Sequence, residues 1–306
     1  MSRISTLAQN QAVVARMLQA QQQVADTQRQ VGSGVIADRF KGIAKDANAL
    51  ISAKAIEART SSYIALGTQV GLRMEVQDAA ISNLYEAAKS LREDLLGALA
   101  NDSGRTLSVN IENAFGASKS VLNTRFAGSY IFAGGRTDTP PFSAVDVPDL
   151  ATIANPITDY FVNSQQKPQV RLDQSLVIEY GVLADDLGQG LLASVKRLAE
   201  YDAATPFGTN LTPADEAIVQ AEIANLDQVM SDIIQIQANN GLTQQRVEET
   251  IIRHEEFDTV NKGFIAAIEE VDIAEAISRL NRQQLAVEAS YSLVRKLNEV
   301  SLLDFI

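Results

Sequence analysis

Residues 70–98 read VGLRMEVQDAAISNLYEAAKSLREDLLGA, and this stretch decides the fold class of the chain. Its apolar residues recur at steps of three and four, a spacing that places them along one side of an α-helix. The row keeps its heptad steps without interruption and consists of Val70, Met74, Gln77, Ile81, Leu84, Ala88, Leu91, Leu95 and Ala98. A seam of this kind predicts a long helix that packs against other helices in a bundle.

A second long seam lies in the C-terminal half of the chain. Its first part consists of Val219, Ile223, Leu226, Met230, Ile233 and Ile236. The pair Asn240-Gly241 then fits a helix stop or a kink. The seam resumes with Val247, Thr250, His254, Phe257, Asn261, Phe264, Ile268 and Val271. Its phase jumps at Ile273, and such a slip predicts a boundary between two packing units.

The two ends of the chain also have helical patterns. The N-terminal helix is expected over residues 1–31. One row consists of Ile4, Leu7, Gln11, Val14, Leu18, Gln21, Ala25 and Gln28, and a parallel row consists of Met17, Val24 and Val31. The C-terminal row runs through Ile273, Ile277, Leu280, Val287, Tyr291 and Val294, with Leu293, Leu297 and Val300 on a neighbouring face. Gln dilutes both seams, so each helix needs a partner. We expect residues 1–34 and 273–306 to pair, antiparallel or parallel, and to keep exposed faces that invite further subunits.

Residues 128–184 differ in composition from the helical segments. Five of the seven prolines and six of the seventeen aromatic residues fall here, which excludes long helices. The alternating apolar residues that predict a β-hairpin around Asp173-Gln174-Ser175 are Val170, Leu172, Leu176, Ile178 and Tyr180. Short helices are expected before and after this insert, over residues 110–126 and 187–199.

These segments predict a mainly α protein, an elongated helical bundle with paired terminal coiled-coil helices and a small β-rich insert. We expect three domains: an inner coiled-coil assembly domain from residues 1–34 and 273–306, a helical bundle from 35–127 and 185–272, and a β-rich outer domain from 128–184. The glycines of GSGVIADRFKGIAKD, residues 32–46, place the N-terminal boundary.

Composition narrows the function of this 306-residue chain. Its net charge of −12 repels phosphate backbones and anionic lipid, and no basic cluster offsets it, so neither nucleic acid nor a membrane is an expected partner. With no Cys and a single His, disulfides, thiol nucleophiles and most metal sites are excluded, and no cofactor is expected. The N-terminus lacks the apolar core of a signal peptide, so any export is expected to avoid that route.

Few motifs suggest chemistry. The string GSGVIA at residues 32–37 fits the dinucleotide-binding pattern, but a Gln-rich helix precedes it where a buried strand is required, so an interhelical connector is favoured. His254 has Glu255 and Asp258 nearby and is a candidate base, yet its seam position favours packing. The paired carboxylates, such as Glu255-Glu256, fit solvated helix faces because adjacent helical side chains diverge.

Four stretches resemble the flagellin family. The chain ends, with QVGSGVIADRFKGIAKDANAL at residues 30–50 and SLLDFI at 301–306, look like that family's termini. The run SYIFAGGRTDTPPF, residues 129–142, is similar to the Y-x-F-x-G-x-x-x-x-x-P-P-F run of the family's hook-associated members. ANNGLTQQRVEE, residues 238–249, resembles the family's G-x-x-x-x-R-x-E helix.

This resemblance implies a structural subunit of the bacterial flagellum at the junction between hook and filament, without catalysis. It implies an extracellular location reached through the flagellar export apparatus, with an export chaperone and without a cleaved signal peptide. The implied partners are other copies of the chain in a ring, the hook-side junction protein and filament flagellin. Two alternatives remain, a short filament flagellin and a secreted enzyme with its site in the insert.

The terminal seams supply the candidate site. We expect assembly contacts from Ile4, Leu7, Val14, Leu18, Ile277, Leu280, Val287, Tyr291, Val294, Leu297, Leu302 and Leu303. No catalytic, cofactor-binding or metal-binding residue is expected.

Overall fold

The computed structural model describes residues 2–36, 45–152 and 155–303, with side chains described from residue 11 to residue 296 within these ranges. The chain forms two compact units. Met1–Arg59 and Phe257–Ile306 make up one, here called the terminal unit, and Thr60–Glu256 make up the other, here called the central unit.

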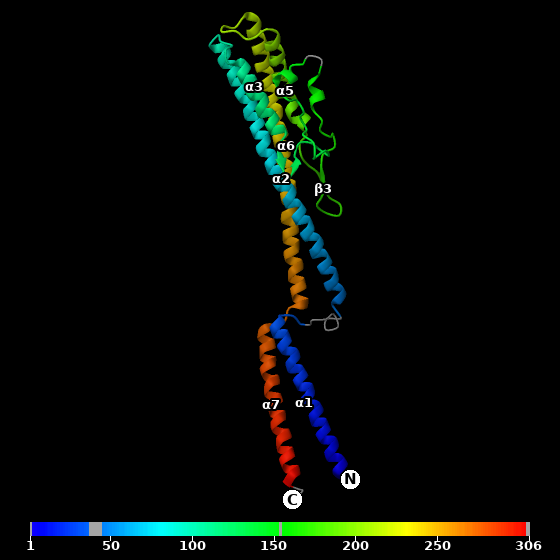
Figure 1. The fold of residues 1–306 in the computed structure, drawn as a ribbon. Helices are drawn as coiled ribbons and strands as arrows, with labels where there is room; N and C mark the ends of the chain where they lie inside the picture. The colour runs from blue at the N-terminus through cyan, green and yellow to red at the C-terminus, as the bar shows by residue number, and fades with distance from the viewer. Residues whose placement is uncertain (1, 37–44, 153–154, 304–306) are drawn as a thin grey trace. The chain divides into compact units, whose positions relative to one another are not determined.

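Helices dominate the described residues, which confirms the predicted mainly α fold (Figure 1). They are α1 (Ser2–Ser33), α2 (Ala47–Ala100), α3 (Leu107–Leu122), α4 (Val147–Leu150), α5 (Ala184–Ala204), α6 (Pro213–Glu269) and α7 (Ile273–Leu303). A 3₁₀ helix, η2, spans Ile157–Tyr160, and the strands are β1 (Arg125–Phe126), β2 (Ser129–Tyr130), β3 (Gln169–Arg171) and β4 (Val177–Glu179). The two longest helices, α2 and α6, carry the two long seams.

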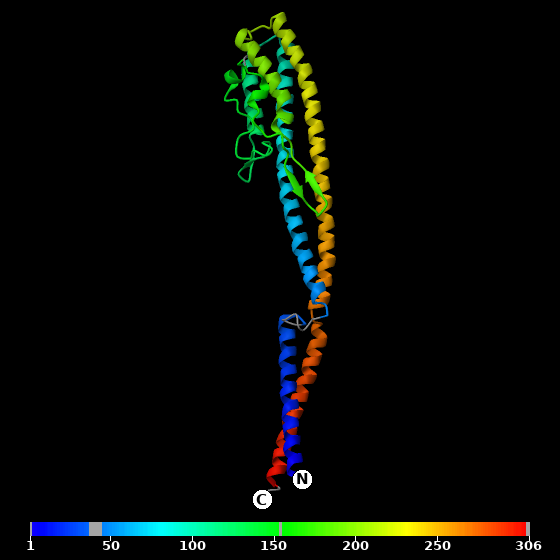
Figure 2. The ribbon, with the colours of Figure 1, turned by 90° about the vertical axis from the view of Figure 1, so that its right-hand side faces the viewer.

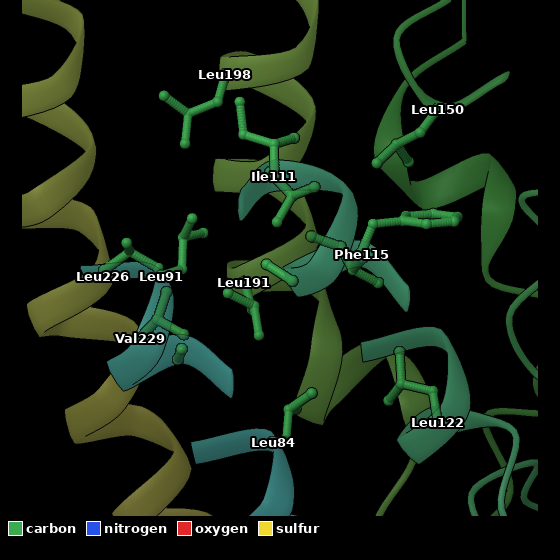
Figure 3. Packing of buried hydrophobic residues seen from close by; sticks show 14 of the residues in the cluster. Leu84, Leu91, Ile111, Phe115, Leu122, Leu150, Leu191, Leu198, Leu226 and Val229 are labelled. Atoms are coloured by element: carbon green, nitrogen blue, oxygen red, sulfur yellow. The ribbon is translucent and has the colours of Figure 1, made fainter. Parts of the chain in front are cut away.

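The core of the central unit is a helical bundle. All nine residues of the seam in residues 70–98 are buried. Figure 3 shows side chains from α2, α3, α5 and α6 meeting, among them Leu91, Ile111, Leu191 and Leu226. Within the central unit α2 and α6 run antiparallel, because Arg92 pairs with Asp227 at 2.5 Å and Gln237 donates to Ser82 Oγ at 2.9 Å. The residues of the heptad seam thus lie in the packed core of the central unit.

Helix α6 begins at a complete capping box. Thr212 N–H donates to Asp215 Oδ2 at 2.7 Å, and Asp215 N–H donates back to Thr212 Oγ1 at 3.2 Å. Pro213 takes the first helical position, where its missing N–H costs nothing. The Tyr201 hydroxyl at the end of α5 donates to Asp215 Oδ1 at 2.7 Å, so this cap also joins two helices.

The insert packs onto the bundle in two places, first through its loops and short helices and then through its β-hairpin. Phe142, Leu150 and Tyr160 belong to the same core cluster as α2, α3, α5 and α6. The predicted hairpin is confirmed as the antiparallel pair β3–β4, and it covers a second cluster between α2 and α6 that includes Met74 and Val247. The other described ladder joins the two short strands β1 and β2.

Two local expectations were wrong. The helix expected over residues 110–126 spans Leu107–Leu122, because β1 begins at Arg125. Of the helix stop or kink expected at Asn240-Gly241, the stop is contradicted, since α6 continues through both residues. Asn240 is buried and its Nδ2 donates to the Met74 carbonyl at 3.4 Å, so contact with α2 outweighs the local preference for a helix end.

Candidate assembly surface

Helices α1 and α7 of the terminal unit form an antiparallel pair (Figures 1 and 2). Backbone hydrogen bonds join their neighbouring ends, from Ile36 N–H to the Glu269 carbonyl at 2.7 Å and from Val271 N–H to the Gly34 carbonyl at 3.0 Å. Further along, Gln21 donates to the Tyr291 hydroxyl. The pairing therefore extends well beyond the connecting segments.

Only one of the two apolar rows of α1 contacts α7. Half-buried side chains recur along the row Met17, Val24 and Val31, and Thr27 on the same side is buried. On α7 the buried Ala276 begins a corresponding row of half-buried residues, Leu280, Gln283, Val287 and Val294. Among the described side chains of these two helices only Thr27 and Ala276 are buried, so the pair covers little of its own apolar surface.

The other apolar rows remain exposed. Val14 and Leu18 of α1 are 42% and 52% exposed. Ile277 and Tyr291 of α7 are 43% and 49% exposed, and the larger exposed set on α7 also includes Ile273, Leu285 and Leu293. These aligned, exposed apolar residues are the candidates for contact with another protein.

The predicted contact residues thus fall into three groups. Val14, Leu18, Ile277 and Tyr291 lie on the exposed rows, where another chain can reach them. The residues that stand half-buried in the α1–α7 pair are Leu280, Val287 and Val294. The side chains of Ile4, Leu7, Leu297, Leu302 and Leu303 lie outside the described residues.

A groove between α1 and α7 combines apolar and amide groups. Its lining consists of Gln21, Val24, Ala25, Gln28, Gln284, Val287 and Glu288. Glutamine side chains supply both donors and acceptors, so a helix packing here meets polar groups it can satisfy as well as apolar contact. The sequence predicted the Gln-rich seam but not this groove, because its lining combines residues from both helices.

Charge is distributed unevenly along the chain. Residues 1–34 hold three Arg and one Asp, and residues 273–306 hold four basic and four acidic residues. The whole acidic surplus of the protein therefore lies in residues 35–272. Contact between copies through the terminal segments would therefore meet less charge repulsion than contact through residues 35–272.

His254, the candidate base, makes packing and hydrogen-bond contacts within the central unit. His254 Nε2 lies 2.6 Å from the Leu172 carbonyl oxygen and donates to it, and the imidazole stacks on Tyr63 with ring centroids 5.4 Å apart. In the described part of the chain, no cluster of three His, Asp or Glu residues suits a metal ion. Of the helices the structure describes, none combines the length and apolar character needed to cross a membrane.

The glycine-rich string at residues 32–37 is a connector where it is described. Gly34 adopts a positive φ of 75°, which suits glycine, and Val35 forms an isolated β-bridge with Glu270. The helix α1 precedes the string, where a dinucleotide site requires a strand. Ala37 lies outside the described residues.

Comparison with known proteins gives one family match and several structural ones. Residues 223–306 match the family described as the bacterial flagellin C-terminal helical region. No curated protein matches the sequence of the chain.

Three solved structures share the fold. A Vibrio parahaemolyticus protein assigned as a flagellar hook-associated protein is 15% identical, with a TM-score of 0.58 over 73% of this chain and 97% of that one. FlgL of Bacillus cereus is 15% identical, with a TM-score of 0.50 over 74% and 99% of the two chains. Flagellar hook-associated protein 3 of Legionella pneumophila is 10% identical, with a TM-score of 0.54 over 75% and 99%.

At 10–15% identity the structural matches establish the fold alone. The family match concerns the C-terminal helices, residues 223–306. Residues 223–306 are thus similar to the bacterial flagellin C-terminal helical region, and the chain shares the fold of the solved flagellar hook-associated proteins, which confirms the resemblance to the flagellin family.

Proposed function

We propose that this chain is a structural subunit of the bacterial flagellum that joins hook and filament and catalyses no reaction. The observation that carries the proposal is the α1–α7 pair, which leaves apolar rows exposed along both helices. The fold shared with flagellar hook-associated proteins and the flagellin region at residues 223–306 support the same role.

The run SYIFAGGRTDTPPF favours the role of a junction protein over that of a filament flagellin. It resembles the hook-associated members of the family, and here Phe132 and Phe142 are buried in the core of the central unit. A short filament flagellin is the second candidate, because exposed terminal helices serve a filament equally well. The two candidates differ in amount, since a junction protein stops at a ring whereas a filament protein polymerises on itself.

The proposal includes partners and a division of labour. Residues 1–34 and 273–306 form the inner assembly domain, 35–127 and 185–272 the bundle, and 128–184 the outer domain. Copies of the chain form a ring between the hook-side junction protein and filament flagellin. The chain reaches this extracellular position through the flagellar export apparatus with the help of an export chaperone.

Electron microscopy of cells that lack the chain tests the proposal. We expect hooks without filaments, and filaments restored when the gene is supplied again. Intact filaments on the deletion strain would remove the junction role. The quantity of the chain in sheared flagella then separates the candidates, because a filament protein dominates that fraction and a junction protein is scarce.

A further inference from the structure

The seam between α2 and α6 poses a problem of register. Its apolar residues repeat every seven positions, so sliding α6 along α2 by one heptad would again set apolar residues against apolar residues. Such a slide amounts to about 10 Å along the helix axis. A single structure therefore needs contacts that fit in one register only.

One contact of the central unit has this property. Gly67 of α2 lies directly against Ile251 of α6, and a Cβ atom added to Gly67 would come within 2.7 Å of Ile251 Cγ1 and 3.5 Å of Leu172 Cδ2. A shift of one heptad would bring Ile251 opposite Thr60 or Met74, and both of these residues carry the side chain that Gly67 lacks. Ile251 therefore fits at Gly67 and at neither alternative.

Polar contacts hold the same register on either side. His254, three residues beyond Ile251, donates to the Leu172 carbonyl at the end of the β3–β4 hairpin and stacks on Tyr63. Asn240 donates to the Met74 carbonyl at 3.4 Å. A heptad shift would separate His254 from Tyr63 of α2, on which its ring stacks.

A matching asparagine recurs in the terminal unit. Asn261 Nδ2 donates to the Ala53 carbonyl at 2.9 Å. This bond joins α6 to α2 as the bond from Asn240 to Met74 does, so each unit has an amide-to-carbonyl contact of the same kind. A shift in one direction would set Asn261 opposite Asp46, which precedes the first residue of α2.

We propose that Ile251 seated on Gly67 is the register key of the α2–α6 pair, with Asn240, His254 and Asn261 holding the chosen register. Gly71 is the natural control for this key. It lies one turn further along α2, and a Cβ atom there would meet nothing within 4 Å.

Disulfide trapping tests the proposal directly, because the chain contains no cysteine. Ser82→Cys with Gln237→Cys reports the observed register, since these two side chains are hydrogen-bonded at 2.9 Å. Ser82→Cys with Met230→Cys, or with Gln244→Cys, reports a shift of one heptad. The parent chain should cross-link only through the first pair.

Gly67→Leu should lower cross-linking of the first pair about tenfold and make a shifted pair cross-link, because it adds a bulky side chain at a filled site. Gly71→Leu should leave the parent pattern unchanged. If Gly67→Leu loses its helical circular dichroism instead, the double variant Gly67→Leu with Ile251→Ala should recover it and restore the first cross-link. Parent cross-linking in folded Gly67→Leu, or failure of the double variant to recover, would overturn the proposal.

Discussion

Asp215 is the residue at which burial and hydrogen bonding oppose each other most clearly. Burial raises the pKa of its carboxyl group, but hydrogen bonds from the Thr212 N–H, the Tyr201 hydroxyl and the Thr212 hydroxyl outweigh it and leave the pKa below 3.8. The bond to Asp215 also raises the pKa of Tyr201. The ionised carboxylate is thus the form that the folded cap prefers.

This preference gives a stability that depends on pH. Because the folded pKa lies below the unfolded value, the stabilisation is complete above that value and is lost as pH falls through the folded pKa, that is, below about 3.8. Asp215→Asn should lower the free energy of unfolding at pH 7 by about 1 kcal/mol, the usual worth of a capping contact. It should also lose less stability than the parent between pH 5 and pH 3. Urea denaturation at these pH values measures both effects, and equal acid losses in parent and variant would contradict the assignment.

A second residue-scale prediction compares two glycines. A Cβ atom on Gly188 of α5 would come within 2.5 Å of Leu122 Cδ1 on α3, whereas one on Gly116 of α3 would meet nothing within 4 Å. Gly188→Ala should therefore cost about 1 to 3 kcal/mol through overpacking. Gly116→Ala should stabilise by about 0.5 to 1 kcal/mol, since alanine favours the helix. Thermal melting measures both, and stabilisation by both substitutions would show that α3 and α5 are packed less closely than described.

At the scale of elements, the heptad pattern predicted the long helices because the pattern is local and its strength accumulates over many turns. The β3–β4 hairpin was also predictable, since its alternation and turn residues are adjacent in sequence. The end of α3 was not, because β1 determines it, and neither was the continuation of α6 through Gly241, which depends on contact with Met74.

The candidate assembly surface was likewise predictable only in part. The sequence identified both apolar rows of α1, but it could not tell which one meets α7, because Met17, Val24 and Val31 are as apolar as the row with Val14 and Leu18. Only the pairing with α7 distinguishes them. The cavities and close approaches that involve glycine depend on the partner helix in the same way, so no spacing rule reveals them.

Helices α1 and α7 bury few of their side chains, and this leads to a prediction for the isolated chain. Because only Thr27 and Ala276 are buried among their described side chains, local opening of this pair should cost far less than opening of the central unit. Limited proteolysis of the monomer, followed by mass spectrometry, should therefore cut within α1 and α7 first and leave a resistant fragment that contains residues 60–256. Early cleavage within α3 or α5 would contradict this order.

At the scale of the whole molecule, stability and assembly should depend on different residues. Ile277 is 43% exposed on α7, in a segment with no acidic surplus, so a charge there meets water in the monomer and a neighbouring chain in an assembly. Ile277→Glu should leave the melting temperature of the monomer nearly unchanged, because exposed positions tolerate substitution within about 0.5 kcal/mol. In the assembly the same carboxylate would be buried without a partner, which costs far more, so filaments should fail to attach to hooks. Val145→Glu is the matched control, since Val145 is 71% exposed in the insert and should tolerate the same charge in both assays. Normal attachment with Ile277→Glu would show that this row faces solvent in the flagellum, and the assembly surface would then have to lie on another face of the α1–α7 pair.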